Sequence, residues 1–328
     1  MKNNNIQRLR GACALIVFLS HSLCMFNSSL ISDIHRTPLW LLFDGQSVVL
    51  IFFALSGFFM DKNYHSMNML KEGITKRFKR LYPVYFVTTI LCYIVYSMHL
   101  DYEVGGVTSW GRRIWSKDLD LWDLFLQLCF IMDIKQTHLL INPVAWYMYR
   151  EAIMMLVLPV LLYLNAKNRG DCLLIVCACI AFVIPPIDFM FPFLCGTILH
   201  RQIKKYLLQI KKIFKNRYYL IPMLVFGIFL YGIRNIIPGL RFSNLFITIG
   251  AMIFISYAYI KDELQKEDLF SKFGNISYEF YLIHFAVLMF FRSYVTNIAL
   301  YSFICFVISV TIAKALSLMD EKLKNLLQ

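Results

Sequence analysis

The sequence predicts an all-α, polytopic membrane protein with about ten transmembrane helices and both termini in the cytoplasm, and three observations carry this prediction. Hydrophobic residues make up 59% of the 328 residues, and charged residues only 16%, whereas soluble domains carry about 25% charged residues. The mean hydropathy is +0.60. The apolar runs are long and continuous, unlike the short alternating segments of membrane β-barrels. Because no soluble segment interrupts them, we expect one membrane-embedded domain over 1–328.

The apolar runs predict the membrane spans in chain order. They lie at 11–27, 43–60, 83–100, 144–164, 172–187, 189–200, 218–235, 243–260, 276–292 and 298–316. The fifth and sixth runs are short for full crossings, and Pro185, Pro186 and Pro192 interrupt them. We therefore expect kinked or re-entrant helices over 172–200, where neighbouring helices re-satisfy the backbone.

The net charge of +13 is explained by topology, because cytoplasmic loops of membrane proteins collect Lys and Arg. With the N-terminus inside, the ten spans place most of the basic residues on the cytoplasmic side. No base-stacking aromatic residues alternate with the basic residues, so we expect no nucleic-acid partner. The nine cysteines lie mostly in apolar runs, where Cys behaves as a small hydrophobe. We therefore expect neither a disulfide framework nor a metal site.

Two connections carry helical patterns of their own. The longest extracytoplasmic connection, 101–143, contains the short apolar segment 121–134, whose length suits an interfacial or re-entrant helix. The basic segment 201–217 alternates Lys pairs with apolar residues at helical spacing. This pattern predicts an amphipathic helix on the inner membrane surface.

The first apolar segment places an ionisable group deep in the membrane. His21 follows Arg10 by eleven residues, and no charged residue lies between them. On a helix this separation is about 16 Å, roughly half the hydrocarbon thickness, so Arg10 would lie at one face and His21 near the middle. An ionisable group at that depth marks a functional site by default. The alternative is a histidine that only bonds a neighbouring helix.

Two short motifs follow at the predicted inner ends of spans. Ser56 and Gly57 end the sequence FFALSG, where small side chains permit close approach of a ligand or simply of another helix. Arg77 and Arg80 in KRFKRLYP stand three apart and share one helix face. Two guanidiniums there can grip phosphates, although a plain positive-inside cluster explains them too. Pro83 is expected in the first turn of the third span.

Two later spans contain buried polar residues. In AWYMYREAIMM, Glu151 lies about 10 Å from the outer end of the span, where a structural ion pair is the alternative to function. In GNISYEFYLIHF, the residues Tyr278, Tyr281 and His284 are spaced by three and share one helix face. Such a stripe is more often packing than catalysis. However, His21, Glu151 and His284 all approach the membrane midplane, and this convergence favours function.

Together these motifs resemble the acyltransferase-3 family of bacterial integral-membrane acyltransferases. The resemblance covers essentially the whole chain and rests on RLRGACALIVFLSH, FFALSG, RFKR, W-x4-E and ISYEFYLIH, in that order. The matched positions are Arg10 and His21, then Phe52, Phe53, Ser56 and Gly57, then Arg77 and Arg80, and then Trp146 with Glu151. Two features depart from the family pattern. Leu50 and Ile51 replace the polar residue that many members carry before the Phe pair, and no soluble hydrolase-like domain follows the last span.

The resemblance implies a membrane O-acyltransferase of the bacterial cytoplasmic (inner) membrane. It would use acetyl-CoA, or another acyl-CoA, as a co-substrate from the cytoplasmic side, with no bound cofactor. The acyl group would pass to a hydroxyl of a surface polysaccharide or of its lipid-linked precursor, completed by the membrane domain alone or with a separate partner. His21 would be the catalytic base, and the donor would be bound or positioned by Arg10, Arg77 and Arg80.

Depth and residue type alone support further roles. An acyl transfer needs a base for the attacking hydroxyl, and histidine suits that role near neutral pH. Glu151 would orient an imidazole or contact the acceptor, and Ser56 with Gly57 would line the inner end of a donor passage. Substrate-binding or structural roles remain for Trp146, Tyr278, Tyr281 and His284.

A second function class uses the same buried groups. A proton-coupled transporter or flippase of a glycan precursor would use His21, Glu151 and His284 as a proton relay. Against it, the sequence has no inverted repeat and no paired broken helices. A scaffold protein would leave these three ionisable groups without a role.

Overall fold

The computed structural model describes residues 3–26, 33, 34, 36–61, 64–100, 108, 111–116, 118–131, 140–167, 171–261 and 267–326. Within these residues the regular structure is entirely helical, with no strand. The predicted all-α class is therefore confirmed.

The described part of the chain contains four helices that are long and apolar enough to cross a membrane. They lie in α4 (Met67–Ser97), α6 (Trp146–Lys167), α12 (Ser243–Ile260) and α15 (Ile298–Leu326). Two bent pairs raise the number to six if each pair is one span, namely α9 (Leu207–Lys215) with α10 (Arg217–Tyr231), and α13 (Leu269–Asn275) with α14 (Ser277–Arg292). The chain is thus a multi-pass membrane protein. The count of ten and the cytoplasmic side of both termini stay predictions.

The remaining predicted runs are also helical. They correspond to α1 (Asn4–Cys24), α3 (Gly45–Met60), α7 (Cys172–Val183) and α8 (Met190–Lys205). One local expectation is wrong, because Pro83 lies inside α4 rather than in the first turn of a span. The RFKR motif continues the same helix upstream of the proline, so Arg77 and Arg80 sit on the extended N-terminal part of α4.

The chain divides into two compact units, each assembled from separate stretches. The first contains Met1–Cys13, Gln46–Arg77 and Ile153–Gly274, and the second contains Ala14–Gly45, Phe78–Ala152 and Asn275–Gln328. The prediction of one membrane-embedded domain over 1–328 stays a prediction.

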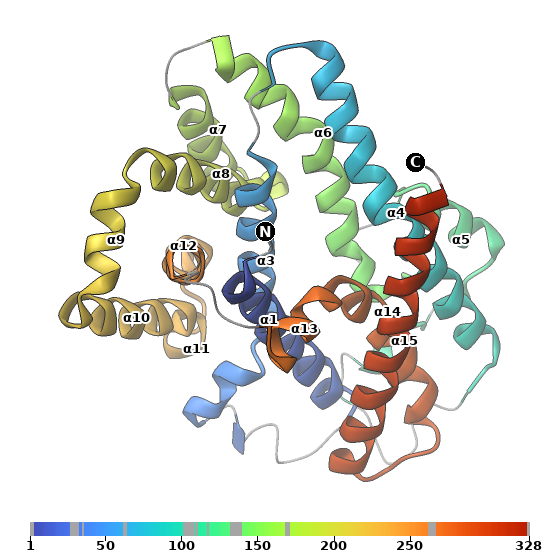
Figure 1. Ribbon diagram of the computed structural model, residues 1–328. Coiled ribbons are helices and arrows are strands. Elements are labelled where there is room, and N and C mark those ends of the chain that lie inside the picture. The colour runs from blue at the N-terminus through green and yellow to red at the C-terminus, as the bar shows by residue number, and fades with distance from the viewer. Residues whose placement is uncertain are drawn as a thin grey trace. The chain divides into compact units, whose positions relative to one another are not determined.

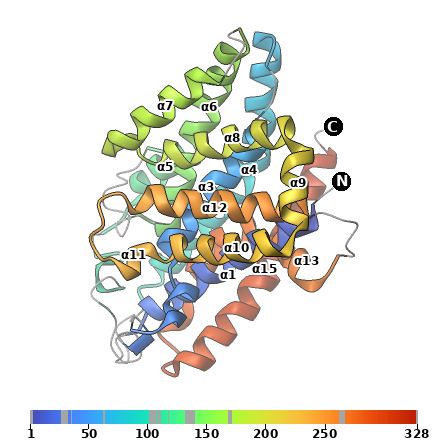
Figure 2. The ribbon, with the colours of Figure 1, turned by 90° about the vertical axis from the view of Figure 1, so that its left-hand side faces the viewer.

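In the first unit, α10 and α12 lie side by side (Figure 2). The helix α8 packs against α7 and α12, and α9 crosses between the ends of α8 and α10 (Figure 1). The backbones of α3 and α8 touch, since a Cβ atom on Gly57 would lie 1.9 Å from the Phe193 carbonyl oxygen. A Cβ atom on Gly196 would lie equally close to the Ala54 carbonyl oxygen, at 1.9 Å. Only glycine allows this approach.

In the second unit, α14 packs along α15 (Figure 1) and is buried over most of its length. A helix that is apolar all round is expected to be enclosed by protein or lipid. The buried stretch 140–145, which ends in a 3-10 turn at Pro143–Ala145, also packs on α14. The Asn142 side-chain amide donates to the Leu282 carbonyl oxygen at 3.2 Å. This contact fixes irregular backbone against the helix that carries His284.

The expected helix over 121–134 is present as α5 (Leu121–Leu128), which begins at a capping box made by Asp120 and Asp123. Its outer face is apolar, because Leu121, Trp122 and Phe125 are exposed, which fits an interfacial helix. Its position at a membrane surface stays a prediction. Within 101–143, residues 101–107, 109, 110, 117 and 132–139 lie outside the described residues.

Candidate active site

Two histidines meet in the second unit. His21 lies in the last turn of α1, and His284 lies in the middle of α14. His21 Nδ1 and His284 Nε2 are 2.9 Å apart, and the planes of the two rings are nearly parallel, at 12°, with their centroids 5.2 Å apart. His284 is fully buried, whereas His21 retains some exposed surface. Both residues are candidates from the sequence because of their depth, and the structure brings them into direct contact.

The hydrogen bonds of the two rings define their tautomers. His284 Nδ1 lies 3.2 Å from the Phe280 carbonyl oxygen, and because a carbonyl can only accept, this nitrogen carries the proton. The neutral His284 ring therefore presents a lone pair at Nε2. It accepts the hydrogen bond from His21 Nδ1, so the lone pair of His21 lies on its Nε2. One backbone carbonyl thus fixes the tautomers of both rings, and His21 Nε2 is left as the basic atom.

Aromatic side chains enclose the pair. The Phe18 ring contacts His284 edge-on at 6.2 Å between centroids, and Phe285 contacts His21 edge-on at 6.0 Å. Phe18 also packs against Phe280 and Phe306. These apolar walls limit solvent around the rings, and proton transfer in such a dry site depends on the groups that the protein supplies.

A chain of side-chain contacts leads from the histidines to Glu151. The Tyr281 ring lies 5.9 Å from His284 and 5.5 Å from the Tyr147 ring. The Tyr147 hydroxyl donates to Glu151 Oε2 at 3.3 Å, and Glu151 is buried. The Tyr281 hydroxyl donates instead to the Val144 carbonyl oxygen at 3.1 Å. Tyr281 thus contacts His284 directly, and Glu151 is connected to it through Tyr147 and Tyr281.

Tyr278 links this cluster to the RFKR motif. Its hydroxyl donates to the Leu81 carbonyl oxygen at 2.6 Å, directly after Arg80. Arg80 and Glu151 both lie close enough to this hydroxyl for their charges to act on it. Arg80 itself is exposed. Tyr278 on α14 thus connects the helix that carries His284 to the neighbourhood of Arg80, whose guanidinium can bind a phosphate.

Tyr147 was not predicted as a site residue from the sequence. Its spacing of four from Glu151 on α6 was the available signal, since residues four apart share a helix face. Trp146, which was singled out, instead packs under the Arg150 guanidinium at 4.9 Å. This contact gives the intramembrane Arg150 an aromatic partner.

The other predicted site residues belong to the first unit. Gly57 is the contact point of α3 and α8, and its carbonyl accepts a hydrogen bond from the Thr197 hydroxyl at 2.9 Å. Ser56 precedes it and is half-buried. Arg10 lies on α1 and Arg77 on α4, and both are partly exposed. All four lie in the stretches that make up the first unit.

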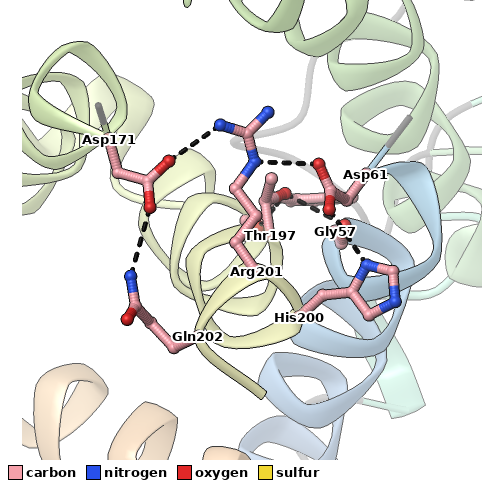
Figure 3. Close-up of polar contacts among 8 residues, drawn as sticks. Gly57, Asp61, Asp171, Thr197, His200, Arg201 and Gln202 are labelled. Carbon is pink, nitrogen blue, oxygen red and sulfur yellow. Dashed lines mark hydrogen bonds and ion pairs between the residues drawn. The ribbon is translucent and has the colours of Figure 1, made fainter. Parts of the chain in front are cut away.

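A second polar cluster, which sequence analysis did not anticipate, lies beside Gly57 (Figure 3). Asp61, just beyond the end of α3, accepts from His200 Nδ1 at 3.0 Å and from Arg201 Nε at 2.9 Å. Arg201 also donates to Asp171 at 2.7 Å, and Gln202 donates to the other Asp171 oxygen at 3.1 Å. Burial opposes ionisation of Asp61, but the hydrogen bonds and charges of His200 and Arg201 outweigh it and lower the pKa of Asp61. The cluster ties α3 to α8 and to the start of α7.

Comparison with known proteins places the chain in a family. A family model described as an acyltransferase domain, that of the acyltransferase-3 family, matches residues 3–318. No curated protein and no solved structure matches the chain. Because the family match covers nearly the whole sequence, the chain belongs to the acyltransferase-3 family of membrane acyltransferases.

Proposed function

We propose that the chain transfers an acetyl or other short acyl group from cytoplasmic acyl-CoA to a hydroxyl of a surface polysaccharide or lipid-linked sugar, with His21 as the general base. The membrane would be the bacterial cytoplasmic (inner) membrane. One observation carries the proposal. The contact between His21 and His284 leaves His21 Nε2 with a lone pair, which is what a base for a sugar hydroxyl needs.

The chemistry balances without any further reagent. The sugar oxygen attacks the thioester carbonyl carbon while His21 Nε2 takes the hydroxyl proton. The carbon–sulfur bond then breaks, and the imidazolium returns the proton to the leaving thiolate. The products are an O-acyl sugar and free CoA. His284 holds the His21 ring and accepts the hydrogen bond that strengthens while the imidazolium exists.

The remaining residues have supporting roles in this proposal. Arg77 and Arg80 grip the donor phosphates, since guanidiniums bind phosphate in a bidentate manner, and Arg10 assists them. Ser56 and Gly57 line the inner end of the donor passage. Glu151, held by Tyr147, contacts the acceptor. Contacts to the bound sugar are expected from Trp146, Tyr278 and Tyr281.

The alternative, a proton-coupled transporter or flippase, would relay protons along His21, His284 and Glu151. The hydrogen bonds around the pair disfavour such a relay. His284 Nδ1 and the Tyr281 hydroxyl both donate to backbone carbonyl oxygens. A carbonyl has no proton to pass on, so these two bonds hold the rings but do not extend a proton path toward Glu151.

Transfer of label from acetyl-CoA tests the function. The purified chain in detergent is given radiolabelled acetyl-CoA and a panel of polysaccharide acceptors, and the label in the glycan is counted. His21→Ala should lower transfer by about 10²- to 10⁴-fold, the usual contribution of a general base. His65→Ala, at an exposed histidine, serves as the matched control. No transfer by the unaltered chain, or full transfer by His21→Ala, would contradict the proposal.

A second comparison tests the phosphate grip. Arg77→Ala combined with Arg80→Ala should raise the KM for acetyl-CoA and leave kcat nearly unchanged, because the lost contacts bind the donor in both ground and transition states. Lys79→Ala removes an exposed charge from the same helix and should leave KM unchanged. Equal KM values for the double variant and the unaltered chain would remove the arginines from the donor site.

A further inference from the structure

The corner between α9 and α10 has a geometry typical of a membrane surface. The axes of Leu207–Lys215 and Arg217–Tyr231 meet at 93°, and Figure 1 shows α9 crossing between α8 and α10. If α10 crosses the bilayer, a helix at a right angle to it lies in the membrane plane. Interfacial helices adopt this orientation.

The surface of α10 indicates where the lipid begins. Along the helix, Ile221, Val225 and Phe226 are exposed, with Val225 at 60%, and in a membrane protein such a surface contacts acyl chains. At the start of the same helix, Tyr218 and Tyr219 are exposed at 88% and 62%. Tyr residues concentrate at the level of the lipid head groups. This pattern is typical of a helix that begins at head-group depth.

The helix α9 has one residue packed against the protein and several exposed lysines. Phe214 is buried and its ring lies 6.4 Å from that of Tyr257 on α12, whereas the apolar side chains of Leu208 and Ile213 are exposed. Lys211, Lys212 and Lys215 of the same helix are exposed as well. Arg217 is exposed immediately after them. We call these four residues the α9 basic face.

The local sequence leaves the α9 basic face strongly positive. No Asp or Glu occurs anywhere in 189–261, so the helices on either side of the corner bring no acidic residue. Each Lys or Arg near an anionic membrane surface adds about 1 kcal/mol of attraction. Zwitterionic head groups offer no comparable net charge.

We propose that the α9 basic face is a docking surface for anionic phospholipids of the leaflet that it faces. Head groups such as that of phosphatidylglycerol would lie against the lysines and Arg217, with Tyr218 and Tyr219 beside them. The acyl chains would run along the exposed apolar surface of α10. This continuity favours a lipid over a free phosphate, because only a lipid uses both surfaces.

Native mass spectrometry of the full-length chain in detergent tests the proposal. Dioctanoyl phosphatidylglycerol, dioctanoyl phosphatidylcholine and glycerol 3-phosphate are titrated separately, and the apparent Kd of each is measured. The unaltered chain should bind phosphatidylglycerol most tightly. Lys211→Gln with Lys215→Gln should weaken that binding on the order of tenfold and leave phosphatidylcholine unchanged.

Two further variants complete the test. Arg112→Gln with Arg113→Gln removes the same charge from an exposed pair in the 3-10 turn Gly111–Arg113 and should leave both affinities unchanged. Lys211→Arg with Lys215→Arg should keep the phosphatidylglycerol preference. Equal affinity for the two lipids, an undiminished preference in the double Gln variant, or glycerol 3-phosphate binding as tightly as the lipid would each overturn the proposal.

Discussion

At the scale of single residues, the importance of His284 lies in where its lone pair points. The Phe280 carbonyl fixes the proton on His284 Nδ1, and Nε2 then accepts from His21. A phenylalanine at this position fills the ring volume but offers no acceptor. We therefore expect His284→Phe to lower kcat by roughly 10²-fold or more while the KM for the acyl donor stays unchanged, measured in the label-transfer assay.

A glutamine at position 284 is the matched control, because its side-chain oxygen restores an acceptor. His284→Gln should recover part of the lost kcat. The ¹⁵N spectrum of His21 supplies an independent readout, since its proton should lie on Nδ1 in the unaltered chain and redistribute toward Nε2 in His284→Phe. An unchanged His21 tautomer in that variant would show that His284 does not position the base.

Asp61 makes a pH-dependent contribution to stability. Its pKa is lowered from an unfolded value near 3.8 because His200 and Arg201 outweigh the effect of burial. The ion pairs therefore stabilise the fold above about pH 4, and this contribution is lost as the pH falls through the lower folded pKa. Asp61→Asn should cost about 1–3 kcal/mol at pH 7. Melting in detergent at pH 7 and at successively lower pH measures the difference.

The same titration contains its own check. The gap between the unaltered chain and Asp61→Asn should narrow as the pH drops below about 4 and close below the folded pKa of Asp61, where the carboxyl group has no charge in either state. Asp118→Asn, at an exposed carboxylate, is the control and should melt like the unaltered chain at pH 7. A gap that persists at the lowest pH would mean that packing, and not charge, explains the loss.

At the scale of elements, substitutions in the FFALSG motif can distinguish a role in helix packing from a role in donor binding. A Cβ atom on Gly57 would meet the Phe193 carbonyl oxygen at 1.9 Å, and backbone cannot move aside cheaply. Gly57→Ala should therefore destabilise the fold by about 1–3 kcal/mol or more, seen as a lower Tm in detergent. Ser56→Ala should destabilise the fold less than Gly57→Ala, because it adds no atom to the contact between α3 and α8. A normal Tm with a raised KM for acetyl-CoA in Gly57→Ala would assign the glycine to the donor site instead.

The elements were largely predictable, whereas their contacts were not. Long apolar runs predict helices because backbone in lipid must satisfy its own hydrogen bonds, and each predicted run contains a helix. The predicted start of the helix at Pro83 was wrong, because a proline tolerated inside a membrane helix looks the same in sequence as one in a first turn. The pairing of His21 with His284 was suggested only by similar depth. The contact itself joins residues 263 positions apart, and no local pattern encodes it.

The lack of a local sequence pattern also explains why the polar cluster around Asp61 was not predicted. Asp61, Asp171 and His200 come from three separate stretches of the sequence, and each looks like an ordinary residue at the end of an apolar run. Only tertiary packing brings them together. The roles of the predicted site residues stay predictions, although the structure gathers His21, Arg80, Glu151, Tyr278, Tyr281 and His284 in one unit.

At the scale of the whole molecule, the side of the membrane on which each loop lies can be tested through α7 and α8. These helices pack together and are joined by the short turn Pro185–Ile187, so they form a hairpin that returns the chain to the side from which it came. At 12 residues, α7 is only about 18 Å long. Whether the hairpin crosses the membrane twice or only enters it, its two ends lie on the same side. With α6 as a further crossing, residues 113 and 212 should lie on opposite sides.

Single-cysteine variants in a cysteine-free background measure this directly. In intact cells, a membrane-impermeant maleimide should label Arg113→Cys, because the positive-inside pattern places 101–143 outside. Lys212→Cys should react only after the membrane is permeabilised. Both side chains are exposed, so a lack of reaction reflects the membrane and not burial, and Leu174→Cys at a fully buried site gives the background. If both exposed positions react from the same side, α7 and α8 do not act as one hairpin, and the orientation predicted from the basic residues fails for this half of the chain.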